Sequence, residues 1–428
     1  MKSFSVREIC VYIERCWQHR KNKDRKTLYS HILIIIISAK SLWESIWGEL
    51  NIREPLWPPI PDHDGFSALH CISYFGIAEV ADTLIKMDRW GVNQQDGAGM
   101  TPLIWAASLG HEEVVRLLLG NKHIRPDRRD SDFCRTALSW AAGNGHKGVV
   151  RLFLRPRFSN PGSIGGRWGK VARVVDVLFG ERYVDPDSLG IYYRTPLSWA
   201  AESGHGGIVR LLLEREGVNP NIPDMKDGRT PLSFAAKNGH EGTVRLLLGR
   251  KNVYPDIPSR YEGTPLSLAA KNGHRGIVKL LLGRKDVNPN SSSGSGQTPL
   301  FWAAWSGHHA IIELLLGRED VDPNTLSKMH GQTLLTRAAE NGHVGIVKLL
   351  LGWRGVNPDI PDTYYGRTPL SLPAENGHVG VVKLLLGRED VNPDSSNECG
   401  ETPLILAARN GHCGVAEQLR SRKSRRTH

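Results

Sequence analysis

The sequence predicts an all-α fold, a solenoid built from pairs of short helices. Two observations support this prediction. A T-P-L-S-x-A-A-x-x-G-H pattern recurs along the chain at a nearly constant period, and each copy contains two short stretches with apolar residues at helical spacing. Isolated helices of this length are marginal in water, so neighbouring copies must stack to bury their apolar faces.

The repeat starts ten times, and each start is a Ser or Thr. The steps between starts are 34, 35, 59, 35, 34, 34, 35, 35 and 34 residues. We therefore expect a repeat array of about ten repeats over residues 61–420, degenerate near 158–190, where Val171–Gly180 and Val184–Asp187 look like half a repeat. A helical segment or connector at 1–60 and a basic tail at 421–428 complete the expected organisation. The starts are Ser67, Thr101, Thr136, Thr195, Thr230, Thr264, Thr298, Thr333, Thr368 and Thr402.

The repeat that begins at Thr230 shows why the pattern favours two helices. Thr230 occupies an N-cap position, and Pro231 fits the first helical position because its missing N–H would have no partner there. A leucine and two alanines at i, i+3 and i+4 then form one apolar face, and Asn238–Gly239 ends the helix. A second helix is expected at about 241–248, and Gly249 is its predicted stop.

The lack of a secretory signal or bilayer-spanning run and the spacing of the cysteines indicate an intracellular protein. No secretory signal opens the chain, and the most apolar run, Ile32–Ile37, is far shorter than a bilayer span. The six cysteines form no CxxC pair, which fits reduced thiols. We expect a cytoplasmic or nuclear location and no membrane contact. The cysteines are Cys10, Cys16, Cys71, Cys134, Cys399 and Cys413.

The positive charge is concentrated at the two ends of the chain. Of the net charge of +11, residues 1–60 carry 10 basic and 6 acidic residues, and residues 420–428 carry five basic and no acidic residues. The remaining 61–419 contain 40 basic and 38 acidic residues. A nucleic-acid-binding stripe along the array is therefore not expected, and nucleic acid is an unlikely partner.

Taken together, the motifs resemble those of the ankyrin family over roughly 63–420. The resemblance depends on T-P-L at seven starts, on G-H at nine sites from His111 to His412, and on V-N-P or V-D-P after the second helix. In the family a His after T-P-L joins neighbouring loops by hydrogen bonds. Here only His70 is present, so part of that bonding is expected to be lost. Serine replaces this His at Ser139, Ser198, Ser233, Ser267 and Ser371.

The repeat sequences, with the motifs T-P-L-S-W-A-A and L-L-L-G-R-x-D-V-N-P, also resemble ankyrin arrays of filamentous fungi. Residues Ile72–Glu79 look like the first repeat of fungal proteins that place a NACHT-type NTPase ahead of the array. Residues 28–60 would then be the tail of a helical connector. No NTPase motif is visible in this chain.

Two patterns suggest chemistry but have structural explanations. The G-H histidines each stand at one point of a repeat, too far apart to converge on a metal. Gly165–Val171 imitates a phosphate-binding loop but lacks a Ser or Thr after Lys170. No catalytic set is visible. We expect no enzyme, metal, cofactor or small-molecule substrate.

Aromatic residues recur at one position of the first helix, which suggests either a ladder for stacking bases or a core position. Phe or Leu stands at the same position in other repeats, so core is favoured. Arg337 breaks this register, and Pro373 interrupts the first helix of its repeat. The tryptophans of the register are Trp105, Trp140, Trp199 and Trp302.

The resemblance implies a non-catalytic scaffold that binds a protein partner through a concave face made of turn tips and first helices, and an acidic partner would fit this face. Residues there vary between repeats and include the Tyr, Trp and Arg types that dominate interfaces. Ordinary solvated surface, the recognition arm of a NACHT-type NTPase, and nucleic-acid binding through the basic ends stay open as alternatives. The candidate partner-binding residues are Tyr192, Tyr193, Arg194, Arg229, Lys237, Tyr261, Lys271, Trp305 and Tyr365.

Overall fold

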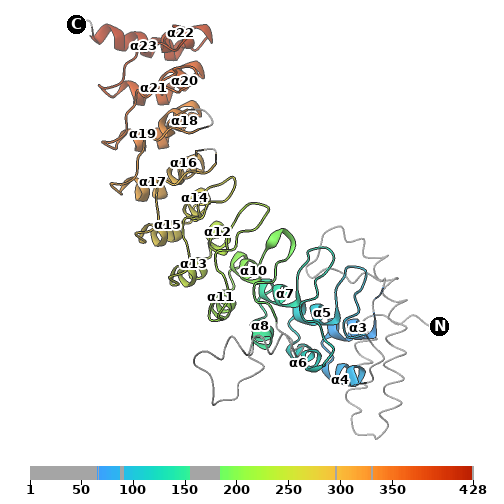
Figure 1. Cartoon of the computed structure of the whole chain (residues 1–428). Coiled ribbons are helices and arrows are strands. Elements are labelled where there is room, and N and C mark those ends of the chain that lie inside the picture. The colour runs from blue at the N-terminus through green and yellow to red at the C-terminus, as the bar shows by residue number, and fades with distance from the viewer. Residues whose placement is uncertain are drawn as a thin grey trace, which may run out of the picture. The chain divides into compact units, whose positions relative to one another are not determined.

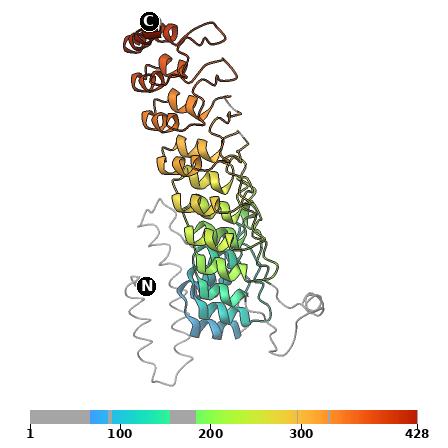
Figure 2. The ribbon, with the colours of Figure 1, turned by 90° about the vertical axis from the view of Figure 1, so that its left-hand side faces the viewer.

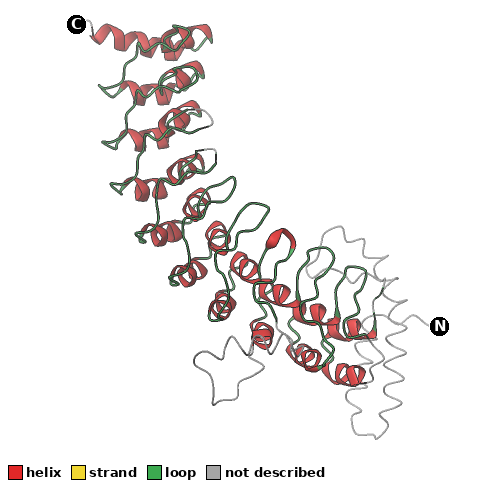
Figure 3. Cartoon of the chain, viewed as in Figure 1, coloured by secondary structure: helices red, strands yellow, loops and turns green. Residues whose placement is uncertain are grey.

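The computed structural model describes residues 65, 67–86, 91–154, 184–294, 296–328 and 331–426. Within these residues it has twenty α-helices, one 3-10 helix (η1, Ile191–Tyr193) and no strand beyond two isolated β-bridges (Figure 3). The prediction of an all-α solenoid is confirmed. Three predicted features lie outside the described residues: the segment 1–60, the phosphate-loop imitation at 165–171, and most of the degenerate repeat.

The helices form ten pairs, one for each predicted repeat start. The first helices are α3 (Ala68–Phe75), α5 (Pro102–Leu109), α7 (Ala137–Gly143), α10 (Pro196–Glu202), α12 (Pro231–Lys237), α14 (Pro265–Lys271), α16 (Pro299–Trp305), α18 (Leu334–Glu340), α20 (Ser371–Glu375) and α22 (Pro403–Arg409). The second helices are α4 (Ala78–Lys86), α6 (Glu112–Gly120), α8 (Lys147–Leu154), α11 (Gly206–Leu213), α13 (Glu241–Leu248), α15 (Arg275–Leu282), α17 (His309–Leu316), α19 (Val344–Leu351), α21 (Val379–Leu386) and α23 (Cys413–Arg426).

The chain divides into two compact units. Unit 1 comprises residues 1–191 and 211–218, and unit 2 comprises residues 192–210 and 219–428. Within unit 2 the first helices form one row, from which the longer turns project, and the second helices form a parallel row (Figures 1 and 2). Within unit 1, α3, α5 and α7 form a row beside α4, α6 and α8 (Figure 1).

The first helices begin as the sequence predicts. The Thr230 hydroxyl accepts the Ser233 N–H at 3.2 Å, and Pro231 occupies the first turn. The same cap recurs, for example from Thr101 to Ile104 and from Thr264 to Ser267. Each cap satisfies one of the backbone donors that a helix start leaves without a partner.

The core lies between the two helix rows. The paired alanines of the first helices, such as Ala235 and Ala236, are fully buried and let neighbouring helices approach closely. The second helices contribute valines and leucines, such as Val244 and Leu247, which are also fully buried. Each repeat buries its apolar face only against its neighbours, so stability belongs to the stack.

The G-H histidines hold successive repeats together. The His240 Nε2 atom lies 2.8 Å from the Glu202 carbonyl, and the His274 Nε2 atom lies 2.9 Å from the Lys237 carbonyl. The same contact joins His146 to the carbonyl of Ser108 at 2.8 Å. Each of these three imidazoles therefore bonds to the last turn of the preceding first helix, where carbonyl groups lack partners within the helix.

The L-L-L-G-R-x-D motif forms a second link between repeats. Arg284 pairs with Asp286 at 2.5 Å and also donates to the Leu248 carbonyl, at the end of the preceding second helix, at 2.6 Å. Arg318 with Asp320 and Arg388 with Asp390 repeat this arrangement. The aspartate fixes the guanidinium, so one side chain satisfies a neighbour's helix end.

His70 performs the loop-joining role that the resemblance implies. Its Nδ1 atom accepts the Ser67 N–H at 3.0 Å, so Nε2 is the donor and lies 3.0 Å from the carbonyls of both Gln94 and Met100. The serines at this position bond mainly within their own repeat, as Ser233 does to Thr230. Thr136 still reaches Ser188 of the following turn at 3.0 Å.

Two irregular positions have clear structural effects. Pro373 shortens the first helix of its repeat to five residues, Ser371–Glu375, whereas α14 has seven. The core assignment of the Trp register is confirmed for Trp105 and Trp140, which are fully buried. It needs correction for Trp199 and Trp302, which are only half-buried and lie under cationic side chains.

Candidate interaction surface

The turns that precede the first helices of unit 2 are joined tip to tip. The Met225 N–H donates to the Tyr192 carbonyl at 2.6 Å, and the Arg260 N–H donates to the Asp227 carbonyl at 2.7 Å. The Glu398 N–H reaches the Tyr365 carbonyl at 3.0 Å in the same way. We call the surface formed by these tips and the exposed side of the first helices the turn face (Figure 1).

Exposed aromatic side chains stand on these tips. Tyr261 is 66% exposed, and Tyr192 and Tyr193 are about half exposed. Tyr364 and Tyr365 occupy the tip before α20, and Met225 adds an exposed thioether at the tip before α12. Amphipathic aromatic side chains of this kind supply contact area at low entropic cost.

The backbone at the first of these tips is unusual. Tyr192 and Tyr193 have φ values of 55° and 60°, in the left-handed region that bulky residues rarely adopt. Within the described residues only Cys134 is a further positive-φ residue other than glycine. Holding such a conformation costs on the order of 1–3 kcal/mol per residue, so two exposed tyrosines are kept here at an energetic cost.

Arg194 is not on the surface. It is 8% exposed, and its guanidinium lies 3.5 Å from the Trp199 ring centroid and 4.2 Å from that of Phe234. Glu202 pairs with it at 2.5 Å. Its role is therefore to hold Trp199 and the end of α10 in place, and it presents no charge to a partner.

Three of the predicted cations converge on Glu262. Lys271 lies 2.7 Å and Arg229 2.5 Å from its carboxylate, with Lys237 at 4.0 Å. Burial alone would raise the pKa of Glu262, but the hydrogen bonds and charges of Lys271 and Arg229 outweigh it and lower that pKa. Arg229 also pairs with Asp227 at 2.8 Å. The cluster thus keeps an excess of one positive charge while most of its cations are paired.

Trp305, at the end of α16, is an exposed aromatic residue on the part of this face formed by the first helices. It is 48% exposed, stacks on Phe301 with an interplanar angle of 14°, and has the Arg337 guanidinium 5.3 Å from its ring centroid. Arg337, which breaks the core register, is held by Glu340 at 2.8 Å. The ring is therefore oriented by neighbours on both sides and leaves half of its surface for contact.

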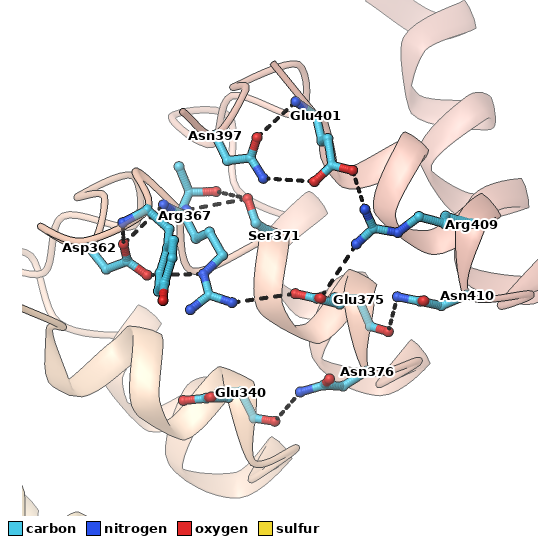
Figure 4. Close-up of polar contacts among 12 residues, drawn as sticks. Glu340, Asp362, Arg367, Ser371, Glu375, Asn376, Asn397, Glu401, Arg409 and Asn410 are labelled. Carbon is cyan, nitrogen blue, oxygen red and sulfur yellow. Dashed lines mark hydrogen bonds and ion pairs between the residues drawn. The ribbon is translucent and has the colours of Figure 1, made fainter. Parts of the chain in front are cut away.

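Charged residues of the last repeats form a continuous network on the same face (Figure 4). Arg367 contacts Asp362 at 3.2 Å and Glu375 at 3.6 Å, and Arg409 contacts Glu375 at 3.7 Å and also Glu401. The Arg367 guanidinium lies 4.6 Å from the ring centroid of Tyr365, which is 57% exposed. The network braces the tip that carries Tyr365.

Sequence reasoning missed two features of this surface. Glu262 was overlooked because it precedes G-T-P-L as an ordinary turn residue, and only the fold brings three cations to it. The stacking of Arg194 on Trp199 has a counterpart in unit 1, where the Arg135 guanidinium lies 4.0 Å from the Trp140 ring. Both pairs belong to the string R-T-x-L-S-W, which could have identified a buried arginine.

No cluster of three or more potential metal-ligating side chains occurs among the described residues. None of the helices described has the length and apolar character needed to cross a bilayer.

A family described as "Ankyrin repeats (3 copies)" matches the chain repeatedly. The matched segments are residues 48–130, 167–260, 251–327, 300–397 and 335–426. They include every first helix and turn of unit 2. The first two segments are separated by residues 131–166, and from residue 167 onward successive segments overlap, as a continuous array of similar units would produce.

Proposed function

Because the chain belongs to the ankyrin-repeat family, we propose that it is a non-catalytic scaffold that binds a protein partner through the turn face of unit 2. Ankyrin repeats are protein-interaction modules, and the family places this side of the stack on its concave face. The observation that carries the proposal is the row of exposed tyrosines on hydrogen-bonded turn tips. Solvated turns need no such side chains, and two of them are held in a costly backbone conformation.

The proposed contact residues are Tyr192, Tyr193, Tyr261, Trp305 and Tyr365, with Arg229, Lys237 and Lys271 as a partly neutralised cationic border. This arrangement supports an acidic partner surface, since the cluster around Glu262 carries a positive excess. Arg194 serves as a support for α10 instead of a contact. Aromatic anchors supply most of the affinity in such interfaces, while border charges mainly accelerate association.

The experiment is affinity capture with the full chain, followed by identification of the retained proteins. A Tyr261→Ala, Trp305→Ala double variant should weaken capture by about 2–4 kcal/mol if both are hot spots and leave the melting transition nearly unchanged. Tyr254→Ala is the matched control, because Tyr254 belongs to the same repeat as Tyr261 and is 64% exposed, but it lies just after α13 and not at the hydrogen-bonded turn tip before α14. Equal losses for the two variants would contradict the assignment of the binding surface.

As a second candidate, we propose the recognition arm of a fungal NACHT-type signalling NTPase. Its support is the likeness of Ile72–Glu79 to the first repeat of such arrays; this segment is the junction between α3 and α4, with Gly76 at φ 74° as its C-cap. An NTP-binding motif encoded in the same reading frame upstream of Met1 would favour this candidate. A reading frame that has no such motif upstream would contradict it.

A further inference from the structure

In several second helices, the residue that follows the G-H histidine covers a glycine of the next repeat. A Cβ placed on Gly148 or Gly276 would overlap the carboxylate of Glu112 or Glu241. His309 covers Gly345, Val344 covers Gly380 and Val379 covers Gly414. A Cβ placed on each of these glycines would lie 3.0, 3.2 and 3.9 Å from the covering side chain. Five junctions between second helices are therefore filled by a side chain from the preceding repeat.

The junction between α11 and α13 lacks this filler. Gly206 stands where the covering side chain belongs, and a Cβ placed on Gly242 would have nothing within 4 Å. A hollow of about 600 Å³ opens here within unit 2. It is lined by Gly204, Gly206, Arg210, His240, Gly242, Thr243, Arg245 and Leu246.

The floor of the hollow contains a hydroxyl without a partner. Thr243 is 2% exposed, and its Oγ1 atom has no hydrogen-bond partner among the described residues. Val or Ile occupies this position in other repeats, as at Ile277 and Ile346. A Cβ on Gly206 would lie 3.8 Å from this oxygen, so the hydroxyl faces the space of the missing side chain. A buried hydroxyl without a partner is destabilising.

The rim of the hollow is cationic. Arg210 is exposed and forms no salt bridge with any described residue, and Arg245 shares its charge with Glu241 at 2.6 Å. The His240 ring is fixed by its bond to the Glu202 carbonyl. Two cations around this hollow, together with the Thr243 hydroxyl, favour an anionic group that can accept a hydrogen bond.

We propose that the hollow between α11 and α13 binds one acidic side chain, Asp or Glu, of a partner protein. The chain itself supplies the precedent, since the corresponding space over Gly148 and Gly276 is occupied by a glutamate carboxylate. The partner's carboxylate would accept a hydrogen bond from the Thr243 hydroxyl and lie between Arg210 and Arg245. This site is on the second-helix row and does not depend on binding at the turn face.

The test measures the anisotropy of fluorescein-labelled hexaglutamate on titration with the full chain at low ionic strength. Gly206→Glu and Gly206→Gln should each raise the Kd at least about tenfold, because either side chain would occupy the part of the hollow beside the Thr243 hydroxyl. Gly120→Glu is the matched control, because it changes the charge as Gly206→Glu does. A Cβ placed on Gly120 would have no atom within 4 Å, and Gly120 does not line the hollow. It should change the Kd less than about twofold. Thr243→Val should raise the Kd about threefold by removing the hydroxyl.

Several results would overturn the proposal. Equal effects of Gly206→Glu and Gly120→Glu would show that net charge alone governs binding. A loss with Gly206→Glu but none with Gly206→Gln would show that nothing enters the hollow. Free glutarate that displaces the peptide completely at equal carboxylate concentration would indicate a small-molecule anion. A labelled hexathymidylate that binds more tightly, with the same dependence on residue 206, would indicate nucleic acid.

Discussion

At the residue scale, the costliest feature of the turn face is the backbone at Tyr192 and Tyr193. Glycine adopts the left-handed region without a Cβ clash, so Tyr193→Gly should raise the free energy of unfolding by about 1 kcal/mol. The same change should weaken partner capture, because the exposed ring is lost. Urea denaturation and capture measured on one preparation test both effects.

The control for this trade-off is Tyr261→Gly. Tyr261 does not have a positive φ, so glycine there should leave stability unchanged or lower it while still weakening capture. A stabilisation of the same size at both positions would show that backbone conformation is not the cause.

His70 gives the N-terminal repeat a dependence on pH. Burial lowers the pKa of its imidazole from 6.5 to about 4, against the opposing effect of the Met100 and Gln94 carbonyls. Because the folded pKa lies below the unfolded one, the neutral ring's contribution is complete above pH 6.5 and is lost as the pH falls through 4. The loss of stability at pH 4 should be about 3 kcal/mol.

Amide hydrogen exchange of α3 at pH 7 and pH 4, corrected for intrinsic rates, measures this loss. A His70→Gln variant should show much less change between the two pH values. An imidazole pKa near 6.5, measured by NMR titration of the folded chain, would contradict the interpretation.

At the element scale, Pro373 is the clearest departure from the repeat. It stands where other first helices have the first alanine of the pair, and α20 begins only at Ser371. Pro373→Ala should let the helix start at residue 369 and restore the Thr368 cap, raising the unfolding free energy by about 1–2 kcal/mol. The shift in urea midpoint is the measurement.

The matched control is Ala269→Pro, which places proline at the same position of a regular repeat. Ala269 is fully buried within α14, so this change should cost about 3 kcal/mol or more. A Pro373→Ala variant no more stable than the original chain would show that the array has adapted to the shorter helix.

Helix boundaries were predictable because their signals are local. The helices α12 and α13 cover the residues expected from Thr230, Pro231 and the two glycine-containing stops. The half-burial of Trp199 was not predictable, because Trp140 stands in the same R-T-x-L-S-W string under Arg135 and is fully buried. The pairing of Arg229, Lys237 and Lys271 with Glu262 likewise joins residues from different repeats, which no local pattern specifies.

At the scale of the whole molecule, the repeat period determined the stack but not the binding surface. Ten starts at a nearly constant step predicted ten helix pairs, and the structure contains them. Which variable positions face a partner depends on the exposure of each side chain. The period does not show that Arg194 is buried while Tyr261 is exposed. The hollow at Gly206 was also invisible, because it results from one missing side chain between two repeats.

The central claim is that a protein partner binds the turn tips of unit 2. The most direct measurement places the photo-crosslinking residue p-benzoylphenylalanine at position 261 or at position 254 of the full chain and compares the yield of covalent adducts with the captured partner. Both tyrosines are similarly exposed, at 66% and 64%. We predict adducts from position 261 and essentially none from position 254. Equal yields, or adducts from position 254 alone, would contradict the claim.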